Sequence, residues 1–570
     1  MVSDLIIPRV EFNGFHNVLH WSPDGSIALN TSGQISIYKP KHTKEITKSS
    51  AVLFDLVKVD IEKLPVNQLF DAEMSDERTG TLFTASTQSI NKLQWSPLYE
   101  NVSYLAILTS YHGVYIIRDG NIWLDVTTKE PITSQAQFDQ QKTHSFGWIA
   151  TEHNLLLCEG LASGHIRTID IFENEEQDFL KVSDHPIVHL KVVDNVMFAV
   201  SSKNEIFKID GSKVEQLKDA DRSMIYDIYV DSTDTVFYTT YSKLHKLSKN
   251  DSNSTNTGLT TPSQVFPCGQ SKLLLIAQSK TAEFTYDLEH TPNDTTEPLL
   301  KKRIQRWNSK FNDFNTRTPL LKIYGASLNF SGNVLAVLYE LEQDAGFKYQ
   351  ISSENTYNVM FVTLDNHGSS KGSSLAHFQE FKITGTIRDV TPEKITPDYG
   401  TDFSTFIRES VNGDSDITKW ASQNLIYGDK DELIKKKYAT LLLNYIKKNK
   451  LTPENIIDKA VINNLHIVAG LNISGEVTDV PFTNSGFTET FDFVLTQNPE
   501  SMRSKTDNEW PTCSLTFLPI LTTAVRVDPV SGRRFIDLTR DTENDYGTLT
   551  KAILSASDIS IYSGCRFVVK

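Results

Sequence analysis

The sequence predicts a mainly β fold, in which a divergent seven-bladed β-propeller is followed by a smaller C-terminal α/β (α+β) domain. A turn motif recurs in the first part of the chain: Trp21-Ser-Pro-Asp-Gly25 returns as Trp95-Ser-Pro97 and, more weakly, as Phe330-Ser-Gly332. Proline presets a turn and glycine tolerates a positive φ, so each motif is typical of a strand that ends in a turn. Short β-rich runs continue to about residue 400, where a helical period begins. Repeated short strands of this kind indicate sheets arranged radially.

Seven groups of β runs follow one another along residues 1–390, and each is a candidate blade. Their leading runs lie at residues 20–21, 93–95, 146–148, 188–193, 225–230, 273–277 and 325–330. The steps from Trp148 to His189 and from His189 to Asp227 match the roughly 40 to 45 residues of a propeller blade. The earlier steps are longer, so the first two blades carry insertions, and residues 71–80 are a candidate for part of one. An antiparallel sandwich would have to hold too many strands.

The order of runs within the first blade illustrates the expected pattern. After residues 20–21 we expect strands at residues 33–38 and 51–54. The Gly-His and Trp-Asp signatures of WD repeats are not in place. The sequence therefore predicts a WD-like propeller that diverges from the usual repeat.

A helical insertion is expected at about residues 297–315, between the sixth and seventh blades. Pro298 suits its first turn. Five apolar residues fall on one face at helical spacing: Leu300, Ile304, Trp307, Phe311 and Phe314. The basic residues that then point outward are Lys301, Lys302, Arg303 and Arg306. They form either a solvated face or a contact with an acidic partner, and Lys302, Arg303 and Arg306 are the candidate partner-binding residues.

Residues 365–400 are rich in Gly, Ser, Thr and Pro and are interpreted as a loop or interdomain link, with a possible strand at 381–383. The C-terminal domain, residues 400–570, then begins with helices at 403–410, 417–427 and 431–448 and one capped by Thr452. In the helix that starts at Asp431 the apolar stripe is expected in the core. Its lysines are expected in solvent: Lys435, Lys436, Lys447 and Lys448.

The last part of the chain returns to β structure. Strands are expected at residues 491–495, 513–527 and 534–538, with a turn at Asp528-Pro-Val-Ser-Gly532. A short helix at 546–554 and a strand pair around Ile559 and Phe567 complete a small α/β domain.

Composition and charge exclude several classes of protein. The 570 residues favour two domains, and no run near 18 apolar residues is present to span a membrane. The start of the chain does not have the pattern of a secretory signal, and four widely separated cysteines indicate a reducing compartment, the cytosol or the nucleus. A net charge of -15 would repel a polyphosphate, so we expect no direct coating of nucleic acid.

No motif for catalysis, a cofactor or a metal is found in the sequence. A phosphate-binding loop, a GxSxG elbow, an HExxH helix and a Cys-x-x-Cys pair are all missing. His16 and His20 would share one face of a strand, but no third ligand accompanies them, which favours a surface or packed role. Cys158 ends an apolar run and is interpreted as a core thiol.

Two segments resemble a known family. The first comprises Trp510-Pro-Thr-Cys-Ser-Leu-Thr-Phe-Leu-Pro-Ile-Leu-Thr-Thr, Asp528-Pro-Val-Ser-Gly-Arg-Arg and Asn544-Asp-Tyr-Gly. The second spans residues 307–364 and includes Phe347-Lys-Tyr-Gln-Ile-Ser-Ser-Glu-Asn-Thr-Tyr-Asn-Val-Met-Phe361. Both are similar to the sixty-kilodalton tau subunits of transcription factor IIIC from yeasts.

This resemblance implies a nuclear scaffold subunit without catalytic activity. It would lie in the tauB part of the factor, which recognises the B box of RNA polymerase III genes such as transfer-RNA genes. The implied partners are a second propeller subunit of tauB, other tau subunits and the TATA-binding protein. DNA would be contacted through these partners, and no membrane or cofactor is implied.

Animal relatives of this family resemble proteins with a C-terminal zinc ribbon and have been described as acetyltransferases. Here the expected Cys-Pro-x-Cys-Gly turn reads Asp528-Pro529-Val530-Ser531-Gly532, so both thiolates are missing. Cys513 and Cys565 alone cannot complete a tetrahedral site. We therefore expect a metal-free version of the ribbon, held by packing, and find no loop that would bind coenzyme A.

Three functions remain open from the sequence. An assembly subunit would co-purify with a second tau propeller, whereas an acetyltransferase would turn over acetyl-coenzyme A on its own. A cytoplasmic propeller adaptor for coats or ubiquitin ligases would have partners unrelated to RNA polymerase III.

Overall fold

The structure is a computed structural model of the 570-residue chain. It describes residues 3–7, 18–31, 34–43, 49–61, 75–76, 81–82, 89–99, 102–110, 112–126, 136, 140–151, 154–248, 251–269, 271–293, 296–310, 319–342, 357–364, 372–386, 396–473, 475–495 and 500–569. The chain forms two compact units. The first unit is Met1–Gly372 with Lys382–Gly385, and the second unit is Ser373–Phe381 with Thr386–Lys570.

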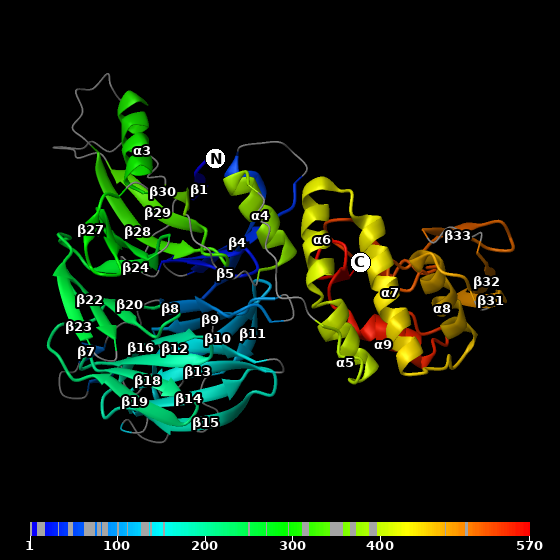
Figure 1. Cartoon of the computed structure of the whole chain (residues 1–570), viewed down its shortest axis with the longest axis horizontal. Helices are drawn as coiled ribbons and strands as arrows, with labels where there is room; N and C mark the ends of the chain where they lie inside the picture. Colours follow the sequence, from blue (N-terminus) through cyan, green and yellow to red (C-terminus); the bar gives the residue numbers. More distant parts are fainter. Residues whose placement is uncertain are drawn as a thin grey trace. The chain divides into compact units, whose positions relative to one another are not determined.

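The described part of the first unit is mainly β and contains seven four-stranded antiparallel sheets (Figure 1). In six of them each strand pairs with its neighbours along the chain. The first three are β2 (Leu19–Trp21), β3 (Ile27–Thr31), β4 (Gln34–Pro40), β5 (Phe54–Asp60); β8 (Ile90–Trp95), β9 (Leu105–Thr109), β10 (Val114–Arg118), β11 (Asn121–Asp125); and β12 (Thr143–Ala150), β13 (Leu155–Leu161), β14 (His165–Asp170), β15 (Glu175–Lys181). The next three are β16 (Ile187–Val193), β17 (Val196–Ser201), β18 (Ile206–Asp210), β19 (Lys213–Lys218); β20 (Asp227–Val230), β21 (Val236–Thr239), β22 (Lys243–Ser248), β23 (Asp251–Asn256); and β24 (Ser263–Pro267), β25 (Lys272–Ala277), β26 (Thr281–Thr285), β27 (His290–Thr291).

The seventh sheet takes its outer strand from the start of the chain. Its order is β1 (Leu5–Ile7), β30 (Tyr357–Thr363), β29 (Val334–Glu342) and β28 (Leu320–Leu328). Strand β1 runs antiparallel to β30, with Leu5 opposite Val359 and Ile7 opposite Tyr357. The two ends of the first unit are thereby joined in one sheet, so neither β1 nor β30 can separate without breaking ladder hydrogen bonds.

Side-chain hydrogen bonds link each sheet of the first unit to the next, and the seventh sheet back to the first. In chain order, the linked atoms are Trp95 Nε1 to His20 O (3.2 Å), Trp148 Nε1 to Gln94 O (3.3 Å), Ser145 Oγ to Ile187 O (2.7 Å), His189 Nε2 and Ile225 O (3.2 Å), Val265 N to Asp227 Oδ2 (2.9 Å), Ala326 N to Gln264 Oε1 (2.9 Å) and Trp21 N to Ser327 Oγ (2.9 Å). Every side chain in these links lies in the leading strand of its sheet, in β8, β12, β16, β20, β24 or β28, so the links run around the unit along one set of strands. The series returns to its start, which closes the set of seven sheets.

The sequence pattern missed β3 and β24, and it also missed most of the outer strands. Strand β15, for example, has six exposed residues and one half-buried residue, so it carries no alternation of apolar and polar positions. The prediction of a strand at residues 51–54 is wrong, because a 3-10 turn (Ser50–Leu53) precedes β5 there. In the expected insertion at 71–80 the structure describes Ser75–Asp76 (β6), which pairs with Thr81–Leu82 (β7); the other residues of that range lie outside the described part.

Along the chain, one helix follows the sixth sheet and another follows β30. The expected helical insertion is α3 (Glu297–Lys310); residues 311–315 of the expected range lie outside the described part. The interpretation of residues 365–400 as a link with a strand at 381–383 is wrong in part, because α4 (Ser374–Thr384) occupies this region. Ser373 Oγ accepts the Ala376 amide at 3.1 Å, and Gly385 follows the helix with a φ of 75°, so both ends carry ordinary helix signals within a Ser- and Gly-rich composition.

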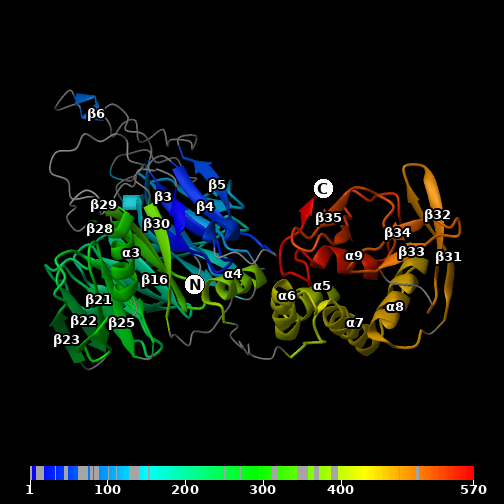
Figure 2. The ribbon, with the colours of Figure 1, turned by 90° about the horizontal axis from the view of Figure 1, so that it is seen from above.

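The second unit begins with helices, as the period of its sequence predicts (Figure 2). They are α5 (Phe403–Phe406) continued by a π-helical turn (Ile407–Val411), α6 (Ser415–Tyr427), α7 (Asp431–Lys448) and α8 (Ile456–Ala469). The cap of α8 is Asn455, whose Oδ1 accepts the Asp458 amide at 2.9 Å, and not Thr452 as expected. No described helix of the chain is both long enough and apolar enough to cross a bilayer.

One lysine of α7 departs from the prediction that its lysines lie in solvent. Lys436, Lys447 and Lys448 are exposed, but Lys435 is 3% exposed. Its ammonium group donates to Glu432 Oε1 at 2.8 Å and to Glu500 Oε1 at 2.7 Å. Two carboxylates therefore compensate the charge while the aliphatic stem is buried.

Short strands and one helix complete the second unit around a single apolar core. They are β31 (Val477–Asn484), β32 (Phe487–Phe493), β33 (Ser501–Arg503), β34 (Glu509–Pro511), β35 (Val525–Val527), β36 (Arg534–Ile536), α9 (Thr548–Ala556) and β37 (Val568–Val569). The expected strand at 513–527 is wrong over most of its length. Cys513 N donates to Leu518 O at 2.8 Å and Phe517 has a φ of 56°, so the chain turns back on itself and buries apolar side chains on all sides.

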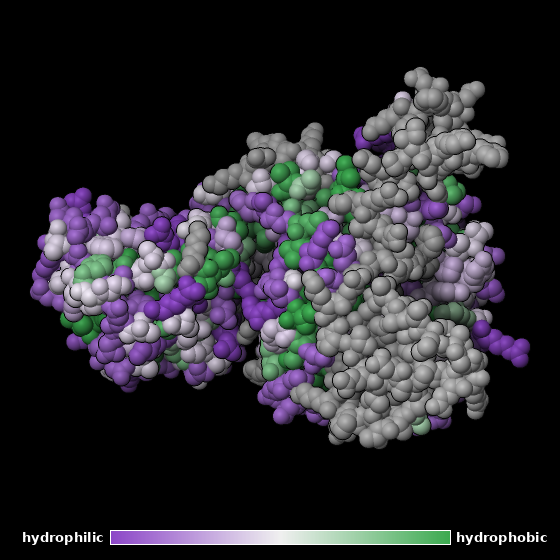
Figure 3. Space-filling model, turned by 180° about the vertical axis from the view of Figure 1, so that it is seen from behind, coloured by the Kyte–Doolittle hydropathy of each residue, from purple (hydrophilic) through white to green (hydrophobic). Residues whose placement is uncertain are grey.

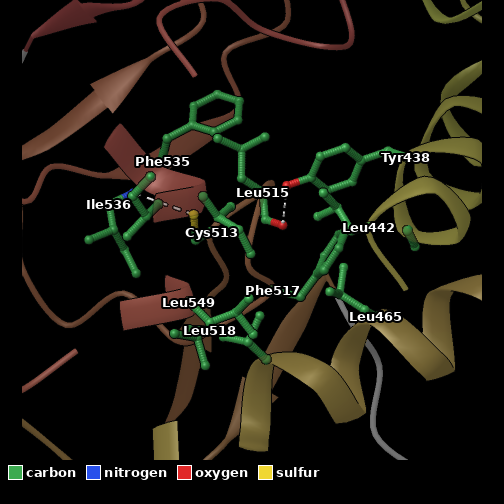
Figure 4. Packing of buried hydrophobic residues seen from close by; sticks show 14 of the residues in the cluster. Tyr438, Leu442, Leu465, Cys513, Leu515, Phe517, Leu518, Phe535, Ile536 and Leu549 are labelled. Atoms are coloured by element: carbon green, nitrogen blue, oxygen red, sulfur yellow. Dashed lines mark hydrogen bonds between the residues drawn. The ribbon is translucent and has the colours of Figure 1, made fainter. Parts of the chain in front are cut away.

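Figure 4 shows how this turn is held in the core. Tyr438 of α7 donates its hydroxyl to Leu515 O at 3.1 Å, and the Ile536 amide of β36 donates to Cys513 Sγ at 3.5 Å. In the view of Figure 3, hydrophilic residues cover most of the described surface of this unit, with smaller hydrophobic areas among them.

Candidate functional site

Helix α3 presents two of its three candidate partner-binding residues to solvent. Lys302 and Arg306 are exposed, and the neighbouring Lys301 pairs with Glu297 at 2.7 Å. Leu300 is buried and Ile304 half-buried, as the helical period predicts. The side chain of Trp307, and all of Phe311 and Phe314, lie outside the described part of the chain.

The prediction that Arg303 points outward is wrong. Arg303 is 9% exposed, and its guanidinium group donates to both carboxylate oxygens of Asp4, with an Nε to Oδ2 distance of 2.8 Å. The hydroxyl of Tyr339 donates to the same Asp4 Oδ2 at 2.7 Å. Arg303 therefore joins α3 to the segment before β1 and to β29, a bidentate contact that its own position in the helix could not reveal.

Replacing Arg303 by alanine should destabilise the first unit by about 2 kcal/mol, because hydrogen bonds to a charged partner contribute roughly 1.5–3 kcal/mol. The loss of stability would be measured by chemical denaturation, with hydrogen exchange of the β29 and β30 amides as the readout. Arg306→Ala is the matched control on the exposed side of the same helix and should change stability by no more than about 0.5 kcal/mol. Equal effects of the two substitutions would contradict the anchoring role of Arg303.

A cavity of about 650 Å³ lies among the leading strands of the sheets in the first unit. Its lining includes three tryptophans and five charged or titratable residues: Trp21, Trp95, Trp148, His20, Lys92, His189, Lys191 and Asp227. The ammonium group of Lys92 donates to Val188 O at 2.5 Å, and burial lowers the pKa of Lys92 to about 8. His189, Asp227 and two of the indole N–H groups are engaged in the links between sheets. These groups link the sheets of the first unit to one another. No nucleophile paired with a base is found among them.

The stability of the first unit should fall on acidification because His189 is held neutral. Burial, and secondarily the charge of Lys92, lower its pKa to about 4. The unfolded chain therefore takes up the proton first, and the stabilisation that is complete above pH 6.5 is lost as the pH falls towards 4. The loss at pH 5 is about 2 kcal/mol.

This pH effect can be measured as the difference between wild type and His189→Gln in amide exchange of β16 and β17, at pH 7.5 and pH 5. The variant lacks the titrating group, so the free-energy difference between the two proteins should shrink by about 2 kcal/mol at the lower pH. A difference that does not change with pH would contradict the assignment.

Two turns of the same pattern face each other in the second unit. The first is Asp528-Pro-Val-Ser-Gly532, and the second is Ser560-Ile-Tyr-Ser-Gly564. In each, the glycine amide donates to the carbonyl of the first residue, at 2.9 and 2.7 Å, and the glycine has a φ of 71° or 67°. Only the first turn is predicted in the sequence, although the second has the same spacing of serine and glycine.

The carboxylate of Asp528 ties these two turns together. Its Oδ1 accepts the amides of Val530 and Ser531 at 2.9 and 3.3 Å. Its Oδ2 accepts the hydroxyls of Ser531 at 2.7 Å and of Ser560 at 2.6 Å. Asp528 is fully buried, so this hydrogen-bonded group lies inside the unit.

The residues at these turns do not fit a zinc ion. The four equivalent positions hold one carboxylate and three hydroxyls, Asp528, Ser531, Ser560 and Ser563, whereas structural zinc sites use thiolates and imidazoles. Burial raises the pKa of the nearby Cys565 to about 12, which keeps it a thiol. Across the described residues, no group of three or more His, Cys, Asp or Glu side chains is placed to hold a metal.

Comparison with curated proteins shows one relative across the whole chain. This chain is 27% identical over 611 aligned positions, covering 100% of both chains, to the transcription factor tau 60 kDa subunit of Saccharomyces cerevisiae. The resemblance predicted from the sequence is confirmed. No family model matches the chain.

The solved structures found are less similar to this chain in sequence. A chain of the mitotic checkpoint complex is 10% identical, with a TM-score of 0.39 over 64% of this chain and 92% of that one. A chain in the structure of BBS1N in complex with ARL6DN is 8% identical, with a TM-score of 0.40 over 65% of this chain and 98% of that one.

Proposed function

We propose that this chain is a non-catalytic scaffold and assembly subunit of transcription factor IIIC. It would act in the nucleus, in the tauB part that recognises the B box of RNA polymerase III genes such as transfer-RNA genes. The observation that carries the proposal is the similarity to the tau 60 kDa subunit from end to end of both chains. The implied partners are a second propeller subunit of tauB, the other tau subunits and the TATA-binding protein.

The architecture proposed for this role is a divergent seven-bladed WD-like propeller over residues 1–390, followed by a C-terminal α/β domain over residues 400–570. The closed series of links between seven sheets and the pairing of β1 with β30 support the first part. The paired turns at Asp528 and Ser560 support a metal-free ribbon at the end of the second. A hydrogen-bonded carboxylate would take the place of the ion there.

A scaffold role agrees with how the polar groups are used. His189, Asp227 and two indole N–H groups of the cavity bond to neighbouring sheets, and burial raises the pKa of Cys158 to about 12, which disfavours a nucleophilic thiolate. A net charge of -15 favours contact with DNA through partners and not directly. Lys302 and Arg306, both exposed on α3, are proposed contacts to an acidic partner surface.

Co-purification from nuclear extract with mass spectrometry tests this proposal. The tagged full chain should recover the other tau subunits, and a partner set without RNA polymerase III factors would overturn the assignment. Acetyl-coenzyme A turnover by the isolated chain would overturn its non-catalytic part.

The role of helix α3 can be tested in the same experiment. Lys302→Glu/Arg306→Glu should reduce recovery of a tau partner about tenfold if these residues face an acidic surface. Lys436→Glu/Lys447→Glu, an equal charge reversal at exposed positions of α7, is the matched control. Equal recovery with both variants would contradict the α3 contact.

A further inference from the structure

Two exposed aromatic side chains pack on a buried and a half-buried tyrosine where two neighbouring sheets of the first unit meet. Trp123 of β11 is 36% exposed, and Phe172, in the turn between β14 and β15, is 42% exposed. Their ring centroids lie 5.7 Å apart, and both rings pack on the buried Tyr104, at 5.2 and 5.9 Å. Tyr99 contacts Phe172 at 5.2 Å. Tyr99, Tyr104, Trp123 and Phe172 are called the aromatic patch below.

The aromatic patch is held in place by the fold beneath it. Asp170 Oδ1 accepts the amides of Phe172 and Glu173 at 2.8 and 3.3 Å, which fixes the turn that presents the Phe172 ring. Tyr104 belongs to the apolar core shared by the two sheets. Preorganised, exposed aromatic rings of this kind are enriched at the centres of protein interfaces.

The residues that follow Phe172, most of them in strand β15, carry negative charge. Glu173, Glu175, Glu176 and Asp178 are all exposed. Within the described residues none of these four carboxylates forms a salt bridge, and the lysine of the strand, Lys181, pairs with Asp184 instead. The patch is therefore bordered by uncompensated acidic groups.

One guanidinium group already lies on the aromatic patch. Arg118 Cζ is 5.7 Å from the ring centroid of Tyr104. In this contact the Tyr104 ring accepts a planar cation, and the exposed rings of Trp123 and Phe172 are left for another.

We propose that the aromatic patch and strand β15 together bind an arginine-bearing basic segment of a protein partner. Arginine satisfies both halves of this surface, because its guanidinium stacks on aromatic rings and pairs with carboxylates. The charge complementarity selects a basic partner and disfavours nucleic acid, whose phosphates the acidic strand repels. The inference rests on the proposed function as an assembly subunit and names the chemistry of one partner.

Binding of a fluorescent octa-arginine peptide to the full chain, followed by fluorescence anisotropy, tests this surface. Trp123→Ala/Phe172→Ala and Glu175→Gln/Glu176→Gln should each weaken binding about fivefold or more, and octa-lysine should bind more weakly than octa-arginine. Two controls remove the same kinds of group elsewhere: Met224→Ala/Tyr241→Ala, at two residues that are each 59% exposed, and Glu215→Gln/Glu289→Gln, at exposed carboxylates. These controls should change binding by less than about twofold.

Equal weakening by the patch variants and their controls would overturn the proposal, since it would reflect only diffuse attraction to a chain of net charge -15. The proposal would also be overturned if an oligonucleotide bound the wild-type chain and bound the patch variants more weakly. The variant Glu175→Gln/Glu176→Gln leaves the aromatic packing intact. It therefore still tests the proposal if Trp123→Ala/Phe172→Ala does not fold. Co-purification of tau subunits with the wild-type chain is a separate experiment. Its failure would overturn the proposed function, but not the binding of arginine at the aromatic patch and strand β15.

Discussion

Replacing Arg167 by alanine is expected to destabilise the first unit by about 3–5 kcal/mol, the cost of leaving a buried charge without its partner. Glu159 of β13 is fully buried, and Arg167 of β14 is 8% exposed. The Arg167 Nε donates to Glu159 Oε2 at 2.8 Å, and Nη2 donates to the same oxygen. Glu159 Oε1 has no hydrogen-bond partner among the described residues, so the guanidinium group is the main compensation for this carboxylate.

The pH dependence of this variant follows from the direction of the Glu159 shift. Burial raises the pKa of Glu159, and the charge and hydrogen bond of Arg167 oppose that rise. Without Arg167 the pKa rises further, so the folded variant binds a proton at a pH where the unfolded chain does not. The penalty is complete at a pH above the folded pKa and is relieved as the pH falls towards the unfolded value of about 4.3.

Amide exchange in β13 and β14, compared between wild type and Arg167→Ala from pH 7.5 to pH 5, measures both effects. Glu159→Gln/Arg167→Met removes both charges and is the matched control, which should recover most of the lost stability. A cost of less than about 1 kcal/mol at pH 7.5 would show that water reaches Glu159 in the folded chain and would contradict its burial.

The sequence predicts many of the buried strands and misses several exposed ones, but it also misses β3, whose five residues are all buried. The apolar run that ends at Cys158 lies in β13, Leu155–Leu161, which is almost fully buried, whereas β15 has no hydrophobic pattern to detect. Strand β1 has apolar residues, but its partner β30 is more than 350 positions away, and no local pattern reports that pairing. Helix α4 was not predicted because the residues around it are rich in Gly, Ser, Thr and Pro, although Ser373 and Gly385 mark its ends.

The candidate site shows the same limit on what local patterns reveal. Helical spacing correctly places Lys302 and Arg306 on the exposed side of α3, but it cannot show that Asp4 draws Arg303 inward, because the two residues are 299 positions apart. The second turn, Ser560–Gly564, repeats the spacing of the first. Serines are not the usual ligands of a structural metal, so the chemistry expected at such a turn gave no reason to select it.

Replacing Asp528 by alanine is expected to destabilise the second unit by about 3–4 kcal/mol, because several charge-assisted hydrogen bonds of roughly 1.5–3 kcal/mol each are lost together. The substitution leaves the buried hydroxyl of Ser560 and the amide of Val530 without their acceptor. It also removes a carboxylate that bonds to both turns. Asp528→Asn keeps a single acceptor oxygen at nearly the same volume and should fall between wild type and alanine.

Thermal and urea unfolding of the full chain, with amide exchange in β35 and β36 as the local readout, would measure the loss. Asp558→Ala removes an exposed carboxylate from the same part of the unit and should cost no more than about 0.5 kcal/mol. If the paired turns are held by the carboxylate, exchange should accelerate in both of them in Asp528→Ala. Acceleration confined to residues 528–532 would mean that Ser560–Gly564 is held by its own packing, and the idea that a carboxylate replaces an ion between the turns would then fail.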